Sequence, residues 1–452
     1  MTIDVPAEPQ APRPTSTFTW SSGNLLTSDP FERSMSLVIF GYESVIAILK
    51  QAFALGLSRS VEWDISNVEA YLQPSYSIAA RVFRRGVPVK DQRQEILQQA
   101  YEITFCSDLD EVIFGFDERD LLIVDSEVAK FWWNRLAKGY RPIDFSESRK
   151  DVEALVEVVS ALRERNHFIR DVVVVGGGVA GDMVGFACGL LGIRCHFVPT
   201  TLLSMVDSSI GGKVGINFEP WGKNQVGLFY PPASVKIWPG WLATLAESEL
   251  QSGAAEALKH ALLSGDRRLW QNIIMIIRNN DWNQFRKLMA EIVAVKSSIV
   301  ARDPFEQGER AILNFGHTLG HAIEILMSRR GKLVPHGACV ALGMVHALRV
   351  SKQYFGFETR SIISELLEAN ILPTGTNLQE ILSLPKDEIL KLIQSDKKND
   401  GNAGVQFILL EDWGKPRRGN NGRWQVEIPI ANVASEIEMT FAFLNNQNRD
   451  ES

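Results

Sequence analysis

The sequence predicts an α/β domain built on a parallel sheet at residues 101–235, followed by a mainly α-helical domain at residues 236–452 with a flexible C-terminal tail. From residue 101, short apolar runs alternate with amphipathic stretches, which is typical of parallel strands covered by helices. After about residue 236, apolar residues recur at helical spacing instead. Residues 1–100 form an N-terminal extension for which the sequence indicates some helix but no function.

The elements can be placed in order along the chain. In the extension, the apolar spacing of SVIAILKQAFALGL (44–57) and QEILQQAYEI (94–103) predicts helices. The runs DLLIVD (120–125) and DVVVV (171–175) predict buried strands, and DVEALVEVVSALRERN (151–166) predicts a helix between them. Three further helices are expected at LAESELQSGAAEALKHALL (245–263), QFRKLMAEIVAVKSSIVARD (284–303) and ERAILNFGHTLGHAIEIL (309–326).

The composition excludes several classes of function. A formal net charge of −7 gives no basic excess for binding nucleic acid or an anionic membrane surface. The four cysteines lack paired CxxC spacing, which argues against a zinc knuckle and against a disulfide framework. The N-terminus is Pro-rich and has no signal-peptide pattern, and no apolar run reaches about 18 residues, so a cytoplasmic location is expected.

A glycine-rich turn follows the second predicted strand. VVVVGGGVAGD (172–182) places three glycines between a buried strand and a helix that is expected to begin near Val179. Glycines there let backbone N–H groups approach a pyrophosphate at the positive end of the helix, although such a turn can also use glycine merely for tight packing. Asp125 ends the preceding strand, where a carboxylate either takes ribose hydroxyls or caps a helix.

A second loop contains polar groups among glycines. PTTLLSMVDSSIGGKVGIN (199–217) and WGKNQVG (221–227) are too irregular for one long element. Hydroxyl, amide and ammonium groups suit a phosphorylated or polyhydroxylated ligand, whereas a solvated surface loop seldom embeds lysines among so many apolar residues. The polar residues are Thr200, Thr201, Asp207, Ser208, Ser209, Lys213, Lys223 and Asn224.

Ligand-type residues gather in the helical half. In ERAILNFGHTLGHAIEIL, residues Arg310, Asn314, His317 and His321 are spaced to share one side of a single helix. A histidine pair on a helix is more often structural than ligating, but Glu256 and His336 each stand alone among small and apolar neighbours. A carboxylate with two imidazoles leaves positions on zinc open for a substrate. Lys259, one turn after Glu256, points a cation toward the same place.

Together these motifs resemble the 3-dehydroquinate synthase family of sugar phosphate cyclases. The matches are GGGVAGD, PTTLLSMVDSSIGGKVGIN, GKN, AEALK, NFGHTLGHAIE, PHG and DKKNDG, in family order from about residue 101 to 410. The resemblance implies an N-terminal NAD-binding α/β domain, a helical domain that carries a divalent metal (zinc, or cobalt as the alternative), and an active site between them. It also implies a homodimer that acts on a small phosphorylated sugar acid.

The resemblance implies roles for individual residues. The metal ligands are matched by Glu256, His317 and His336, which leaves His321 facing the substrate. The positions that hold NAD are matched by Asp125, Glu147, Lys150, Gly176, Gly177, Gly178, Asp182, Thr200, Thr201 and Thr244. The substrate-contacting positions are matched by Asp207, Lys213, Lys223, Asn224, Lys259, Lys296, Arg310, Asn314, His321 and one lysine of the pair Lys397 and Lys398.

The implied reaction converts 3-deoxy-arabino-heptulosonate 7-phosphate to 3-dehydroquinate and phosphate. NAD oxidises a ring alcohol, phosphate is eliminated, the ketone is reduced again, and ring opening and aldol closure form the carbocycle. Because Lys296, Arg310, Asn314 and His321 persist, the carboxylated substrate is favoured over sedoheptulose 7-phosphate or an aminated heptulosonate. A polyol dehydrogenase would not need the lysine cluster, and a catalytically silent binding protein would be expected to have lost it.

The chain departs from the family at one position that touches the chemistry. The family commonly has Tyr-x-Arg-Gly before PTTL, and that arginine reaches the substrate phosphate, often across a dimer interface. This chain reads GFACGLLGIRCHFVPTT (185–201) and lacks that arginine. Arg194 is the nearest remaining guanidinium, and it either substitutes for the missing residue or is a solvated residue at the start of a strand.

Overall fold

The computed structural model describes residues 101–450, apart from 117–118, 133, 137–139, 165–168, 219–221 and 396–403, and four strands within the first hundred residues. β2 pairs with β4 and also with β11, so the N-terminal extension adds strands to a sheet of the main body. The helices predicted at 44–57 and 94–103 lie outside the described residues, except that Glu102 and Ile103 belong to a strand. The four early strands are β1 (Ser16–Ser22), β2 (Ser36–Ile39), β3 (Val61–Val68) and β4 (Ile78–Arg81).

The α/β half is built on a six-stranded sheet in which every pairing is parallel. Val172 to Val175 of the central strand β8 are fully buried because helices cover both faces, which explains the continuous apolar run. The predicted strands at 120–125 and 171–175 are confirmed as β6 and β8. In spatial order the strands are β5 (Glu102–Phe105), β12 (Ser234–Ile237), β9 (Arg194–Pro199), β8 (Asp171–Gly176), β6 (Leu121–Asp125) and β7 (Arg141–Ile143).

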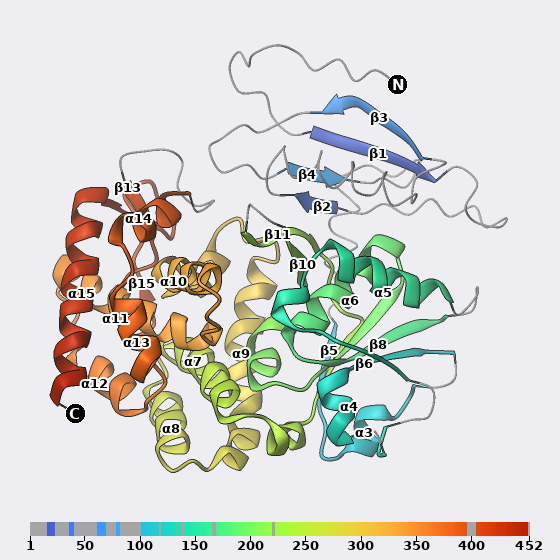
Figure 1. The fold of residues 1–452 in the computed structure, drawn as a ribbon, viewed down its shortest axis with the longest axis horizontal. Helices are drawn as coiled ribbons and strands as arrows, with labels where there is room; N and C mark the ends of the chain where they lie inside the picture. The colour runs from blue at the N-terminus through green and yellow to red at the C-terminus, as the bar shows by residue number, and fades with distance from the viewer. Residues whose placement is uncertain are drawn as a thin grey trace.

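The connections around β6 and β8 create a crevice for a ligand. β6 connects to β7 on one side, whereas β8 connects to β9 on the other, so the two connections diverge between the carboxyl ends of β6 and β8. Open α/β sheets bind ligands at such switch points. Figure 1 shows α5 and α6 on one face of the sheet and α3 and α4 on the other. These helices are α3 (Leu109–Ile113), α4 (Ser126–Trp132), α5 (Val152–Glu164) and α6 (Gly178–Leu191).

The polar loop at 199–227 is more regular than the sequence indicated. A π-helical segment, η2 (Ser204–Ser208), follows β9 and is succeeded by an antiparallel hairpin of β10 (Lys213–Phe218) and β11 (Gly222–Phe229). Lys213 therefore opens one hairpin strand, and Lys223 and Asn224 lie near the start of the other. The hairpin lies beside the helical half (Figure 1), where Lys223 pairs with Glu324 and Lys213 with Glu306, whereas Asn224 contacts Lys150 of the α/β half.

The second half is mainly helical, as predicted. Its central helix is α7, in which 13 of 18 residues are buried. Two small antiparallel pairs, β13 with β16 and β14 with β15, were not expected from the sequence. The helices are α7 (Glu247–Ser264), α8 (Arg267–Arg278), α9 (Phe285–Arg302), α10 (His317–Arg329), α11 (His336–Phe355), α12 (Arg360–Glu368), α13 (Gly375–Leu382), α14 (Lys386–Ser395) and α15 (Ile430–Asp450), and the strands are β13 (Gly404–Phe407), β14 (Leu410–Asp412), β15 (Lys415–Pro416) and β16 (Val426–Pro429). Short helical turns are η1 (Glu147–Arg149), η3 (Pro239–Thr244), η4 (Trp282–Gln284) and η5 (Glu309–Asn314).

The prediction of one continuous helix at 309–326 is wrong. The chain forms the 3-10 turn η5, then Phe315 and Gly316, and only then α10. Gly316 has a φ of +80°. A Cβ on it would lie 2.9 Å from the Val340 carbonyl oxygen, so the close approach of α11 requires glycine here. Arg310 and Asn314 therefore do not share a helix face with the two histidines.

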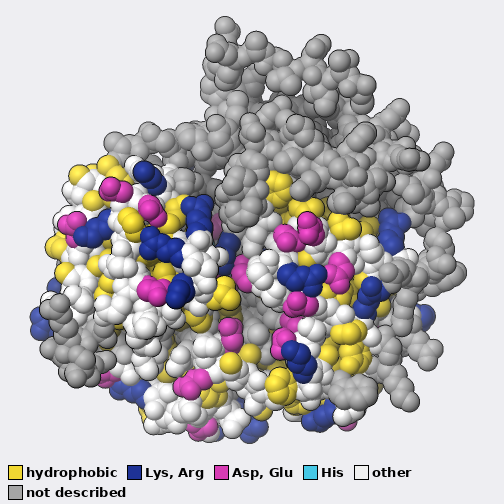
Figure 2. Space-filling view, in the orientation of Figure 1, with side chains coloured by type: hydrophobic (Ala, Val, Ile, Leu, Met, Phe, Trp, Pro, Cys, Tyr) yellow, Lys and Arg dark blue, Asp and Glu magenta, His cyan; other side chains and the backbone are white. Residues whose placement is uncertain are grey.

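The surface agrees with the balanced composition. On the face shown in Figure 2, Lys and Arg side chains are interspersed with Asp and Glu, and neither sign dominates a large area. Among the helices that the structure describes, none combines the length and apolar character needed to cross a bilayer.

Candidate active site

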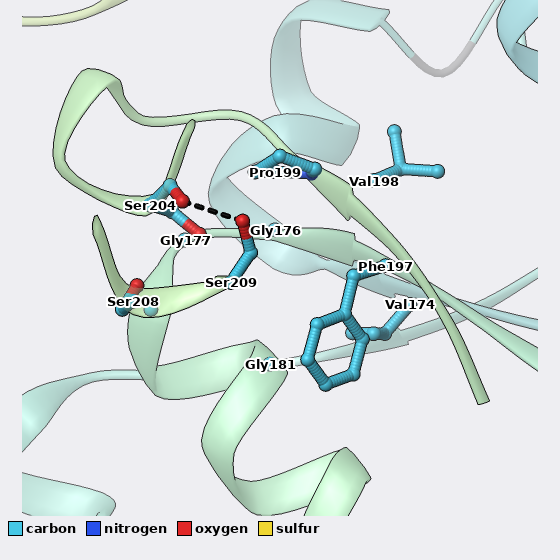
Figure 3. Close-up of a pocket in the computed structure, with 11 residues that line it drawn as sticks. Val174, Gly176, Gly177, Gly181, Phe197, Val198, Pro199, Ser204, Ser208 and Ser209 are labelled. Atoms are coloured by element: carbon cyan, nitrogen blue, oxygen red, sulfur yellow. Dashed lines mark hydrogen bonds between the residues drawn. The ribbon is translucent and has the colours of Figure 1, made fainter. Parts of the chain in front are cut away.

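The glycine turn lies at the switch point of the sheet. Gly177 is the N-cap of α6, which begins at Gly178, one residue before the predicted start. A Cβ on Gly177 would lie 3.0 Å from Thr201 Cγ2, and one on Gly178 would lie 2.8 Å from Ser208 Oγ. The three glycines, Ser204, Ser208 and Ser209 line a small open pocket (Figure 3). Small residues at a helix N-terminus give an anionic group access to backbone N–H donors.

Asp125 caps a helix, which is one of its two predicted roles, and its second oxygen lies near the glycine turn. Its Oδ1 accepts a hydrogen bond from the Glu127 N–H at 3.0 Å and so caps the first turn of α4. Its Oδ2 would lie 3.7 Å from a Cβ on Gly176, so the second oxygen faces the glycine turn. Burial raises the pKa of the Asp125 carboxyl to about 6. One oxygen is therefore left beside the crevice where a nucleotide ribose would lie.

A buried lysine connects a predicted cofactor residue with a predicted substrate-contacting residue. Lys150 Nζ donates to Asp182 Oδ2 at 2.5 Å and to Asn224 Oδ1 at 2.6 Å. Asn224 adopts a positive φ of 51°, and its N–H donates to Asn217 Oδ1 at 2.9 Å. Desolvation raises the pKa of Asp182 although Lys150 opposes the shift. Glu147 is tied to the same region because Asn217 Nδ2 donates to it at 3.0 Å.

The three predicted threonines lie in different surroundings. The Thr200 N–H donates to the Gly176 carbonyl at 3.0 Å, and Thr201 Oγ1 accepts from the Ser204 N–H at 3.1 Å, so both stand beside the glycine turn. Thr244, at the end of η3, instead accepts from Trp132 Nε1 at 3.1 Å and therefore lies beside α4.

Glu256, His317 and His336 come together from three different helices. Glu256 Oε1 lies 3.5 Å from His317 Nε2 and 3.6 Å from His336 Nε2. Glu256 is fully buried, and no described residue donates an aligned hydrogen bond to either of its oxygens, although Oε2 forms an ion pair with Lys259. His321 is also close, because its ring nitrogen lies within 4.8 Å of those of the other two histidines.

The orientation of both imidazoles suits a metal ion. His317 Nδ1 lies 3.1 Å from the Phe315 carbonyl oxygen, and His336 Nδ1 lies 3.1 Å from Glu324 Oε2. In each ring an oxygen acceptor lies at Nδ1, so Nε2 is the nitrogen that faces Glu256. A buried carboxylate without aligned donors and two imidazoles that present Nε2 to it fit one divalent cation with open positions, which would take the place of any proton on Nε2. The residues present are thus chemically suited to the predicted metal.

The electrostatics of this cluster also favour a cation. Burial lowers the pKa of His336, but Glu324 and Glu256 outweigh burial and raise it to about 10. The pKa values of both glutamates are depressed, because neighbouring cationic groups offset the desolvation. His317 has a pKa well below its ordinary value, chiefly through burial.

A second set of buried charges adjoins the metal cluster. Asp207, from η2, lies 2.8 Å from Lys296 Nζ, 3.3 Å from His260 Nε2 and 3.9 Å from Lys259 Nζ. These contacts hold the pKa of Asp207 well below its usual range despite desolvation. Asp207, Glu256 and His260 are close enough to suggest another metal site, but the two ammonium groups at the same carboxylates oppose a second cation.

Arg310 is a buried cation that has no carboxylate partner among the described residues. Its Nη1 donates to the Pro304 carbonyl at 2.6 Å, and its Nη2 donates to the Gly211 carbonyl at 2.9 Å. The side chain is 3% exposed, and no described carboxylate forms an ion pair with it. Its charge lowers the pKa of nearby Lys296, whose own burial is the larger cause. Buried charges are normally paired, so this guanidinium is suited to an anionic ligand.

Lys213 and Asn314 share a carboxylate that the sequence did not indicate. Glu306 forms an ion pair with Lys213 and accepts a hydrogen bond from Asn314 Nδ2 at 2.7 Å. Glu306 has a φ of +55°, which is rare for a residue with a side chain. Two predicted substrate-contacting groups are thus brought together around an anion that belongs to the protein.

Lys397 and Lys398, the last predicted substrate-contacting residues, lie outside the described residues.

Arg194 begins β9, at the opposite end of the strand from Thr200, and donates two hydrogen bonds to Asp171 at 2.7 Å. Both residues stand at the amino ends of their strands, so Asp171 holds Arg194 at the opposite end of the sheet from the glycine turn. This contact favours the alternative of a largely exposed residue at the start of a strand.

Three site residues were missed in the sequence. Glu324 follows His317 by seven residues, a spacing that places two residues on one helix face, and this signal was available. His260 follows Lys259 directly, and nothing but its ligand type marked it. Glu306 lies in the loop between α9 and η5, where no periodicity applies.

The fold defines the class of molecule. A solved 2-deoxy-scyllo-inosose synthase complexed with carbaglucose-6-phosphate, NAD+ and Co2+ superposes with a TM-score of 0.62 at 23% identity, covering 75% of this chain and 96% of the other. A 2-epi-5-epi-valiolone synthase from Streptomyces hygroscopicus subsp. jinggangensis 5008 with NAD+ and Zn2+ bound gives a TM-score of 0.62 at 24% identity, covering 76% and 97%. The chain thus has the fold of the sugar phosphate cyclases, as predicted.

Sequence relatives give the family within that class. Residues 142–252 match 3-dehydroquinate synthase N-terminal, and residues 253–399 match 3-dehydroquinate synthase C-terminal. A 3-dehydroquinate synthase from Methylacidiphilum infernorum (isolate V4) is 39% identical over 280 residues, which cover 61% of this chain and 74% of the relative. One from Prochlorococcus marinus (strain MIT 9515) is 32% identical over 353 residues, covering 73% and 93%. The chain belongs to the 3-dehydroquinate synthase family of enzymes.

Proposed function

We propose that this enzyme converts 3-deoxy-arabino-heptulosonate 7-phosphate to 3-dehydroquinate and phosphate, with NAD and one divalent metal. The observation that carries the proposal is the buried charge cluster beside the Glu–His–His set. Lys259 is paired with Glu256 and Lys296 with Asp207, whereas Arg310 has no described carboxylate. Such an excess of buried positive charge is stable only where an anionic ligand joins it. A polyol dehydrogenase would have no use for it.

The cofactor residues surround the switch point of the sheet. Gly176, Gly177 and Gly178 would hold the pyrophosphate of NAD, Asp125 the ribose, and Lys150 with Asp182 the neighbouring part of the nucleotide. Bound NAD supplies a transient oxidation of a ring alcohol, which acidifies the adjacent C–H. In support, the two solved sugar phosphate cyclases named above hold NAD+.

The metal would be held by Glu256, His317 and His336. A bound divalent ion supplies Lewis acidity that polarises a substrate oxygen, and zinc or cobalt suits this donor set. Lys259 and Lys296 lie beside the cluster as fixed ammonium groups, so they stabilise negative charge that develops on the substrate. His321, whose ring nitrogen lies within 4.8 Å of those of the other two imidazoles, would move a proton at that nitrogen.

The anionic ends of the substrate have distinct partners. Arg310 and Lys296 would bind the carboxylate, because a guanidinium buried against carbonyl oxygens still attracts an anion. Lys213, Asn224 and Asn314 would bind the phosphate, with Lys397 or Lys398.

The homodimer, the cytoplasmic location and the domain boundaries at residues 100 and 235 stay predictions.

Product analysis tests the proposed reaction. The enzyme is incubated separately with the carboxylated heptulosonate phosphate and with sedoheptulose 7-phosphate, and phosphate, carbocycle and NADH are followed. We expect phosphate and 3-dehydroquinate to form together from the first sugar without accumulation of NADH, because the cofactor is regenerated in each cycle. Faster turnover of sedoheptulose 7-phosphate would overturn the substrate. NADH growing in step with product would overturn the cyclase reaction and favour a dehydrogenase.

Asp125 gives the cofactor affinity an expected pH dependence. The carboxyl accepts ribose hydroxyls only when ionised, and its pKa is raised to about 6 by burial. The affinity for NAD should therefore increase as the pH rises through that value and decrease below it. Between about pH 7 and about pH 5 the ionised fraction falls nearly tenfold, and the Kd for NAD should rise by a similar factor.

The matched variant for this test is Asp125→Asn. Asparagine is as good a helix cap as aspartate, so α4 keeps its start while the titrating group is removed. Fluorescence titration with NAD should give a flat profile for the variant over the same pH range. A wild-type profile that is equally flat would show that Asp125 does not contact the ribose.

A further inference from the structure

Glu324 lies between the proposed metal site and the β10–β11 hairpin. Its Oε2 accepts from His336 Nδ1 at 3.1 Å, and its Oε1 accepts from Lys223 Nζ at 2.8 Å. The side chain is 10% exposed, so both contacts form largely away from water. The Glu324 carboxylate therefore contacts His336 of the helical half through one oxygen and Lys223 of the α/β half through the other.

The local fold explains why Glu324 occupies this place. On α10 it stands seven residues after His317, which brings both side chains to the face that packs against α11. His336 is the first residue of α11, and its ring is turned with Nδ1 toward Glu324 and Nε2 toward Glu256. Lys223 reaches in from β11 and also contacts Glu147 at 3.1 Å.

We propose that Glu324 is a positioning residue that fixes the tautomer of His336 for metal binding and, through the same carboxylate, couples the metal site to Lys223. This inference rests on the proposed function, because it takes His336 as a metal ligand. An anionic acceptor at Nδ1 makes the opposite nitrogen a stronger donor to a metal, and such partners typically change metal affinity by about ten- to a hundredfold.

The coupling has a definite sign. Lys223 draws charge from the carboxylate that polarises His336, so the two donors compete for Glu324. Without Lys223, the full negative charge of Glu324 acts on the His336 ring. A neutral side chain at position 324 removes that charge from the ring. Lys223→Met and Glu324→Gln should therefore act in opposite directions on metal affinity.

The test measures metal affinity rather than turnover. Metal-stripped enzyme is titrated with zinc in competition with a chromophoric chelator. We expect Glu324→Gln to raise the Kd for zinc by about ten- to a hundredfold and Lys223→Met to lower it. An unchanged Kd in Glu324→Gln overturns the inference, and an unchanged or higher Kd in Lys223→Met overturns the coupling to Lys223. Glu436→Gln removes another buried carboxylate, one that interacts with Gln353 and Arg349, and serves as the control.

An NMR measurement on the wild-type enzyme provides a second test that does not require the variant to fold. If Glu324→Gln fails to fold by circular dichroism, the nitrogen NMR shifts of His336 in zinc-loaded wild-type enzyme decide, because a proton on Nδ1 supports the inference and a bare Nδ1 overturns it. Wild-type enzyme that binds no zinc at all defeats the proposed function itself. Tight zinc binding that Glu324→Gln does not change defeats only the role of Glu324.

Discussion

Glu256→Gln is expected to lower turnover by about a thousandfold or more, because it removes the single carboxylate toward which both imidazoles are directed. The amide is nearly isosteric, but it is neutral and a poorer ligand for a divalent cation. It also removes the nearer of the two carboxylates beside buried Lys259 and leaves only Asp207, at 3.9 Å. Metal content after dialysis, measured by atomic emission, should fall together with the rate.

Glu247→Gln provides the matched control for this prediction. Glu247 begins the same helix, α7, and is exposed. This variant should keep both its metal and its turnover. If Glu256→Gln retained a full complement of tightly bound metal, the carboxylate could not be a ligand, and the cluster of His317, His321 and His336 would have to bind the ion alone.

Gly343→Ala is expected to destabilise the enzyme by about 3 kcal/mol or more, because α11 touches the chain at Gly316 through this residue. A Cβ on Gly343 would lie 1.8 Å from the Gly316 carbonyl oxygen and 3.0 Å from the Gly320 nitrogen. Both contacts involve backbone atoms, which cannot rotate away, so α10 and α11 must separate. His317 and His336 begin these two helices, and zinc affinity should fall with the melting temperature.

Gly181→Ala is the control substitution for the stability measurement. Gly181 also lies in a helix, α6, but a Cβ there would meet nothing within 4 Å. Alanine in a helix is favoured over glycine by about 0.5 to 1 kcal/mol, so the melting temperature should hold or rise slightly. Equal melting temperatures for Gly343→Ala and wild type would mean that the α10–α11 contact is looser than the structure has it.

The sequence predicted those parts of the fold that depend on local periodicity. The strand at 171–175 is buried on both faces and reads as an unbroken valine run, and α7 and α9 follow the predicted helical segments closely. The break at Gly316 could not be predicted in this way. Its cause is the backbone of α11 pressing on one residue, and that contact spans more than twenty positions of sequence.

The candidate site was predictable where residue type alone marks the chemistry. Glu256, His317 and His336 stand out because a charged or ligand-type side chain among small apolar ones is costly to bury. Glu324 has a helical spacing signal, but a glutamate in a helix is common enough to pass as a solvated residue. Arg194 was left open because its partner Asp171 becomes visible only when β8 and β9 are placed side by side.

Glu306 gives the proposed phosphate subsite a tethered competitor. An anion that enters between Lys213 and Asn314 has to displace this carboxylate, which is present at a constant effective concentration however dilute the solution. A monovalent anion from the medium carries the same charge as the Glu306 carboxylate, so its binding to Lys213 and Asn314 is no stronger and it seldom displaces the carboxylate. A phosphate dianion carries more negative charge than the Glu306 carboxylate. It also has a high effective concentration when the rest of the sugar is already bound in the site. If the phosphate binds there, we therefore expect the subsite to discriminate by exchange and to accept an anion only when the rest of the substrate binds with it.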